Sequence, residues 1–179
     1  MAITRLGGAN AISGTLPAAN INDTSIGNIT ALPAAISTGK VLQVQTASTQ
    51  TQVNSTSGTH ADTGLTCNIT PSSTSNKVLI IINQVFAKNN ADNFIDAKVL
   101  RDSTDISSVG GRSIAYTGDS GYLYPGVSFS YTKKDNPNTT SQVTYKVQFK
   151  RAGGGGGTVR ANVDSGASTI ALLEIEEWL

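Results

Sequence analysis

The hydrophobic and polar positions divide this chain into two parts with different patterns. From residue 40 onward, apolar residues alternate with polar ones or form short β-branched runs, and turn residues separate these segments. Before residue 40, single large aliphatic residues stand among Ala, Gly, Ser, Thr and Asn without a helical or a strand period. We therefore expect residues 1–39 to be an extended attachment arm and residues 40–179 to be one compact domain.

The second part predicts strands and no amphipathic helix. Apolar Leu42 and Val44 alternate with polar Gln43 and Gln45, which is typical of a half-buried strand. The β-branched run from residue 77 to 86 instead predicts a strand buried on both faces. The expected strands cover residues 40–46, 65–69, 77–86, 95–101, 113–116, 127–132, 143–149, 158–163 and 169–175.

Turn residues separate these strands and indicate the fold class. Pro71, the pair Asp102-Ser103 and the loop at residues 133–141 all favour turns. The five glycines at 153–157 predict a flexible hairpin loop, and a phosphate-binding loop is disfavoured because Thr158 begins a strand and not a helix. Many short strands with such turns predict an all-β fold, an antiparallel β-sandwich of jelly-roll type, with a closed barrel as the alternative.

The arm is too poor in apolar residues to fold alone. Ordering its 39 residues costs on the order of 40–80 kcal/mol of backbone entropy. Burying its nine large aliphatic residues returns only about 14–27 kcal/mol. We expect it to become ordered on a partner surface, although a disordered tail is the simpler alternative. The expected contact residues are Ile3, Leu6, Ile12, Leu16, Ile21, Ile26, Ile29, Leu32 and Ile36.

Composition narrows the class of protein further. Thirteen Lys and Arg against twelve Asp and Glu give a net charge of +1 without a basic cluster, which argues against nucleic-acid binding. The apolar stretch at residues 78–82 is too short to span a bilayer. Arg5 is not followed by a continuous apolar segment, so we expect no secretory signal and synthesis in the cytoplasm. Cys67 is the single cysteine, so no intrachain disulfide is expected.

The residues with potential chemistry do not form a catalytic set. His60 and Asp62 suggest two metal ligands, but zinc needs three or four, so a solvated loop histidine is expected. Cys67 shares the inward face of its predicted strand with Leu65 and Ile69, which predicts a buried thiol and not a nucleophile.

The C-terminal segment contains a group of acidic residues. Glu174, Glu176 and Glu177 could suggest a glycosidase. We expect Glu174 and Glu176 to lie instead on the wet face of the last strand, with Ile175 on the other face. No enzyme activity, cofactor or metal site is therefore predicted.

Several strand-and-turn segments resemble the small β-sandwich virion proteins of tailed phages. They are residues 69–79, 99–104, 144–147 and 168–175, together with the leader residues 1–5 and 10–12. The resemblance implies a homotrimeric β-sandwich that projects from the virion. It also implies one of two roles, a capsid decoration (cement) protein or the tip of a tail fibre.

These two roles predict different partners. A cement protein would bind the major capsid protein on the outer capsid surface through its arm, and three arms per trimer would raise its avidity. A fibre tip would bind host-surface carbohydrate, and Tyr116, Tyr122 and Tyr124, expected in the longest loop region, are the candidates for stacking on a sugar. The arm leads into one sandwich without a fibrous shaft, which favours the cement role, although a separately encoded tip subunit fits the short chain equally.

Overall fold

The computed structural model describes residues 40–107, 112–114, 122–154, 156–163 and 166–176. These residues form β-strands and turns, without an α-helix among them. The strands are β1 (Val41–Thr49), β2 (Val53–Ser55), β3 (Ala61–Ile69), β4 (Lys77–Asn89), β5 (Asn93–Arg101), β6 (Thr104–Asp105), β7 (Arg112–Ile114), β8 (Tyr122–Asp135), β9 (Val143–Gly153), β10 (Val159–Ala161) and β11 (Ser168–Ile175).

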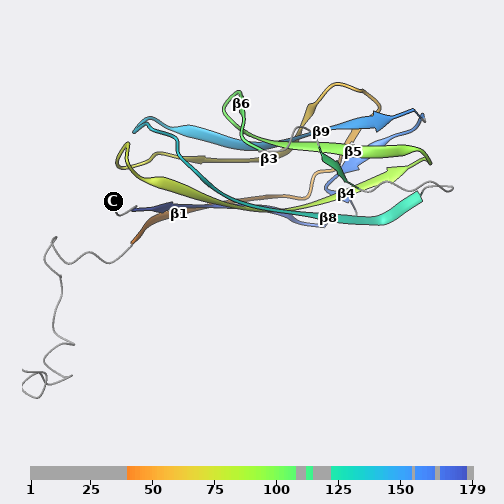
Figure 1. Cartoon of the computed structure of the whole chain (residues 1–179). Coiled ribbons are helices and arrows are strands. Elements are labelled where there is room, and N and C mark those ends of the chain that lie inside the picture. Colours follow the sequence, from red (N-terminus) through yellow and green to blue (C-terminus); the bar gives the residue numbers. More distant parts are fainter. Residues whose placement is uncertain (1–39, 108–111, 115–121, 155, 164–165, 177–179) are drawn as a thin grey trace, which may run out of the picture. The chain divides into compact units, whose positions relative to one another are not determined.

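The strands form two antiparallel sheets that lie face to face (Figure 1). Sheet A has the order β1-β11-β4-β10-β2, with β8 on the other side of β4, and sheet B has the order β3-β9-β5-β6, with β7 also on β5. β10 and β11 pair with successive parts of β4, so they form one interrupted strand, and β1 with β2 forms another.

β6 and β7 both pair with β5 on its side away from β9 and share one position, so the described residues make eight strand positions in two sheets. Sheet A contains the first, eighth, third and sixth, and sheet B the second, seventh, fourth and fifth. This order is that of a jelly roll, in which two Greek keys form a sandwich. The predicted all-β sandwich is confirmed, and the alternative of one closed barrel is wrong because the strands divide into two separate sheets.

Every predicted strand is present, and only β2 and β6 were not predicted. They are three and two residues long, too short to show a period. One prediction about burial is wrong: β4 is not buried on both faces, because Ile81 on its outer side is 43% exposed. The β-branched run reflects its central place in sheet A and not burial on both sides.

The glycine-rich segment is not a hairpin. It connects β9 in sheet B to β10 in sheet A, so the chain crosses from one sheet to the other here. Gly153 and Gly157 have positive φ angles of 98° and 96°, and a Cβ at Gly157 would lie 2.6 Å from the Cβ of Asn90. Glycine is needed at these positions because the crossing packs closely against the β4–β5 turn.

The core consists of alternate residues of both sheets. Phe86 of β4 contacts Phe149 of β9, with ring centroids 5.8 Å apart, and Phe129 of β8 at 6.1 Å in an edge-to-face arrangement. These aromatic contacts tie the centre of sheet A to sheet B. Around them lie Val78, Ile80, Ile82, Ile95, Val99, Tyr145, Val147, Ile170 and Leu172, each 1% exposed or less.

A polar network crosses this apolar core at the gap between β10 and β11. Asn162 follows β10, is completely buried, and donates from Nδ2 to the carbonyl oxygens of Thr51 and Thr63, both at 2.8 Å. Its Oδ1 accepts a hydrogen bond of 2.7 Å from Gln84 of β4, and Gln84 in turn accepts from the Thr63 hydroxyl. One side chain therefore joins the β1–β2 connection, β3 and β4.

Replacing Asn162 should be strongly destabilising. Asn162→Ala removes three side-chain hydrogen bonds and leaves buried partners unsatisfied, so we expect a loss of about 3–5 kcal/mol in the free energy of unfolding. Asn162 also has a φ of 58°, so Asn162→Gly should lose about 1 kcal/mol less than Asn162→Ala. Urea unfolding of both variants tests this, and equal stability of wild type and Asn162→Ala would contradict it.

Candidate functional site

The first strand of the sandwich presents its apolar side chains to the outside. Val41 and Val44 are each 54% exposed and Leu42 is 40% exposed, whereas Gln43 points inward and is half-buried. The predicted strand is confirmed, but the expected burial of its apolar side is wrong. These three residues and Ile81 are the large hydrophobic side chains exposed in the described part of the chain.

The inward direction of Gln43 follows from its partner in β11. Glu174 lies opposite Gln43 in the β1–β11 ladder and is completely buried. The Gln43 side-chain amide donates to Oε2 of Glu174. Oε1 accepts from the Ser72 main-chain N at 2.7 Å, the Ser72 hydroxyl at 2.8 Å and the Asn76 amide at 2.6 Å. The carboxylate thus ties the β3–β4 turn to the edge of sheet A.

The structure corrects the prediction for Glu174, which was expected on a wet face. Glu174 is on the inner side of β11, and Ile175 is the half-buried residue beside it. Burial alone would raise the pKa of the Glu174 carboxyl, but the hydrogen bonds from Gln43, Asn76 and Ser72 outweigh it and hold the pKa below the ordinary 4.5. The group is a structural clamp, and Glu177 lies outside the described residues.

This clamp should make stability depend on pH in the acid range. Since the folded-state pKa is lowered, the stabilisation is complete above the unfolded value of 4.5 and is lost as the pH falls through the folded value. We expect Glu174→Gln to be less stable than wild type by about 1–3 kcal/mol at pH 7. Urea unfolding between pH 3 and pH 7 should show this gap narrowing below about pH 4.5. A difference in the free energy of unfolding that stays constant from pH 3 to pH 7 would contradict this role of Glu174.

The exposed surface that begins at the apolar side chains of β1 continues across the outer face of sheet A. The registers of β1, β11, β4 and β8 place rows of outward residues side by side. The rows are Val44, Leu173, Leu79 and Lys134; Thr46, Ala171, Ile81 and Thr132; and Ser48, Thr169, Asn83 and Ser130. Lys134 at the β8 rim is the only charged residue in these rows. We call this surface the neutral face.

An open groove lies in the neutral face between β1 and β4. It has a volume of about 460 Å³ and runs over β11. Its lining residues are small or β-branched and uncharged: Thr46, Ala47, Ser48, Ile81, Asn83, Thr169, Ile170 and Ala171. Such a surface suits an aliphatic side chain of a partner, with hydroxyl groups at its rim.

The outer face of sheet B has the opposite character. Asp62 of β3 accepts from Gln148 at 2.7 Å and from Lys146 at 3.1 Å. Asp96 of β5 lies 3.3 Å from the Nζ of Lys150 on β9. The charges on this face thus pair across neighbouring strands. The two outer faces of the sandwich therefore differ, and the neutral face is the candidate binding surface.

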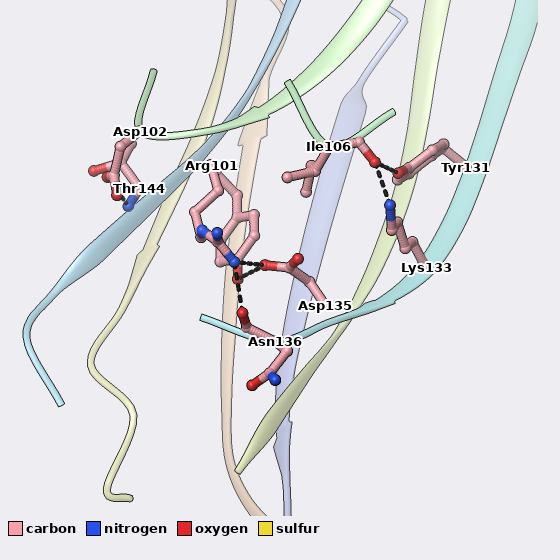
Figure 2. Close-up of polar contacts among 9 residues, drawn as sticks. Arg101, Asp102, Ile106, Tyr131, Lys133, Asp135, Asn136 and Thr144 are labelled. Atoms are coloured by element: carbon pink, nitrogen blue, oxygen red, sulfur yellow. Dashed lines mark hydrogen bonds and ion pairs between the residues drawn. The ribbon is translucent and has the colours of Figure 1, made fainter. Parts of the chain in front are cut away.

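A third polar cluster joins the ends of β5 and β8 (Figure 2). Arg101 of β5 in sheet B donates to Asp135 of β8 in sheet A at 2.7 Å and to the carbonyl oxygen of Asn136 at 2.9 Å. The buried hydroxyl of Tyr145 donates to the same carboxylate oxygen at 2.7 Å. Burial, followed by the hydrogen bond to Asp135, raises the pKa of Tyr145 far above its ordinary value. Every group of the cluster has a partner, so it holds the two sheets together.

A second contact in the same view fastens the segment after β6 to β8 (Figure 2). Tyr131 donates its hydroxyl to the carbonyl oxygen of Ile106 at 3.0 Å, and the Lys133 ammonium donates to the same oxygen. Burial raises the pKa of Tyr131 to about 12. Ile106 is itself buried, so this contact closes the sandwich between the β8 edge and the β6 edge.

The two tyrosines should contribute unequally to stability. Tyr145→Phe removes a buried hydrogen bond to a carboxylate, for which we expect a loss of about 1.5–3 kcal/mol. Tyr131→Phe removes a bond to a neutral carbonyl oxygen, so the expected loss is about 0.5–1.5 kcal/mol. Chemical unfolding of both variants provides the comparison, and a larger effect for Tyr131→Phe would contradict the ranking.

The structure also places the two residues considered for chemistry. His60 is not a solvated loop residue: it is half-buried, with Nε2 3.4 Å from Asp96, and burial lowers its pKa against the opposing effect of Asp96. Cys67 is buried as predicted, and burial raises its thiol pKa. Among the described residues, no three His, Cys, Asp or Glu side chains gather where they could hold a metal ion. No helix in that part of the chain is long and apolar enough to cross a membrane.

The residues first chosen as binding sites fall outside what the structure describes. The arm, with all nine of its aliphatic contact residues, lies outside the described residues, and so does Tyr116. Tyr122 and Tyr124 belong to strand β8 and not to a loop as expected, and their side chains are not described. The binding roles of the arm and of the tyrosines stay predictions. The neutral face was missed because its signal, an apolar side turned outward, appears only when the inner side of β1 is known.

Comparison with known proteins finds a distant likeness. No protein-family model matches the chain. No curated protein matches it either. The similar solved structures include the infectious bursal disease virus VP2 subviral particle, with 12% sequence identity and a TM-score of 0.42. They also include the infectious bursal disease virus Gx strain, with 12% sequence identity and a TM-score of 0.41. They align with 74% and 76% of this chain, which spans only 39% and 37% of theirs. A likeness at this level carries no argument about function.

Proposed function

We propose that this protein is a structural component of a tailed-phage virion, a homotrimeric capsid decoration protein that attaches to the major capsid protein. Its arm and the neutral face of its sandwich make the attachment, and the charged face of sheet B points to solvent. It stabilises the outer capsid shell and catalyses no reaction.

The observation that carries this proposal is the exposed apolar face of sheet A. Val41, Leu42 and Val44 are exposed at the point where the arm joins the sandwich, and Ile81 continues the same surface. Apolar surface of this kind, rimmed by polar residues, marks protein interaction sites. The arm carries only two charged residues, Arg5 and Asp23, so its chemistry is similar to that of the neutral face and both parts fit one type of partner surface.

One further feature supports a structural role over an enzymatic one. The described polar clusters around Glu174, Asn162 and Asp135 are saturated with hydrogen bonds inside the fold. Their geometry fits the holding together of strands. The jelly roll itself is a scaffold used for many functions, so the argument rests on the surface and not on the fold.

Attachment to particles should depend on both the arm and the neutral face. Deleting residues 1–39 should leave a folded sandwich that no longer binds virions. Ile81→Lys places a charge on the neutral face and should weaken binding at least about tenfold, because the ammonium would be desolvated in the interface. Occupancy on purified virions lacking the protein, measured by quantitative gel staining, tests both variants.

A lysine on the opposite face of the sandwich provides the matched control. Thr66→Lys adds the same charge to the outer face of sheet B, where Thr66 is exposed beside Lys146, and should leave occupancy unchanged. Full occupancy by the truncated chain would refute the arm's role. A decoration protein should also stain at a level comparable with the major capsid protein, whereas scarcity would favour a fibre tip.

A further inference from the structure

The outer edge of β1 is open along a regular stretch of strand. Residues 43–49 pair in unbroken register with residues 168–174 of β11 on one side. On the other side, no strand among the described residues pairs with β1. This edge therefore presents alternate backbone N–H and C=O groups that can accept another strand.

The other three edges of the sandwich carry features that oppose strand addition. β3 carries Asp62 and a register shift before Thr66, with Gly64 at a φ of 84°. β6 and β7 contain only two and three residues. β8 contains Pro125, the charged pair Lys133-Lys134 and a register shift against β4. Short strands, charges, bulges and coverings are the usual protections of sheet edges.

β1 has none of these protections between residues 43 and 49. Its sequence there, Gln-Val-Gln-Thr-Ala-Ser-Thr, contains no charge, proline or glycine. The irregularity at Leu42 precedes the stretch and does not interrupt it. Val44 on its outer side is 54% exposed, and Gln45 is exposed as well. A long, uncharged and regular edge of this kind is a template for another strand.

We propose that β1 pairs with the β1 strand of a second copy of this chain, antiparallel and across a two-fold axis. A second copy supplies the same uncharged, unprotected edge, so the contact is self-complementary. With the axis at Gln45, Val44 lies opposite Thr46 of the second copy, and Gln43 opposite Ala47. The β-branched pair Val44–Thr46 occurs twice on the neutral face and stabilises such a ladder. The row from Leu79 through Leu173 to Val44 then continues into the second copy.

This inference goes beyond the proposed function and does not depend on it. A two-fold contact at β1 joins copies in pairs wherever the protein is located on a virion. It is also separate from a three-fold axis, so pairs and trimers can coexist in one assembly. A failure of the β1 contact would therefore leave the decoration role and its trimer standing.

The mass of the full chain in solution tests the contact. The wild-type mass from light scattering should be an even multiple of 18.5 kDa. Val44→Lys brings two like charges close to the axis and should halve that mass, with the dissociation constant raised about tenfold or more. Thr132→Lys, exposed on β8 of the same sheet, is the matched control and should leave the mass unchanged. Circular dichroism confirms that each variant is folded.

Cross-linking provides a second readout that does not require a disruptive charge. Gln45→Cys places a thiol near the axis, and a short bismaleimide should convert most of the protein to a covalent dimer. The wild type is the background control, because Cys67 is buried and its raised pKa keeps it unreactive. Thr132→Cys should not form dimers. A wild-type monomer, an odd-numbered oligomer unaffected by Val44→Lys, or equal cross-linking at positions 45 and 132 would overturn the proposal.

Discussion

The buried carboxylate of Glu174 determines which side of the first strand faces inward. Its hydrogen-bond donors are the neutral groups of Gln43, Ser72 and Asn76, and a buried carboxylate is costly unless such donors surround it. Because Gln43 must point inward to reach it, the alternation of the strand turns Val44 outward. The buried polar contacts of Glu174 and the exposed apolar side chains of β1 therefore have the same cause.

Hydrogen-bonded side chains hold the sandwich together at several places outside its apolar centre. Asn162 joins three segments at the break between β10 and β11, and Asp135 joins the sheets through Arg101 and Tyr145. Each network is satisfied internally, and satisfied buried networks favour one arrangement of strands over its alternatives. The side chains of these networks therefore act in holding the strands together.

The two outer faces of the sandwich differ in charge, and the proposed function assigns partner binding to one face and solvent to the other. On sheet B, charges pair with each other across strands, which keeps that face hydrated. On sheet A, the central rows are uncharged and Val44 and Ile81 are exposed. The proposed function assigns the aliphatic residues of the arm and this face to the same partner.

The sequence by itself determined the strands, the all-β sandwich and the burial of Cys67, because alternation and turn residues are local signals. It did not determine the faces of β1 and β11. Leu42 and Val44 were expected inside and Glu174 outside, and the structure reverses both. The reason is that these positions depend on Ser72 and Asn76, about a hundred residues from Glu174 in the chain. Only the tertiary structure brings those donors to the carboxylate, and so only it decides which apolar residues remain for a partner.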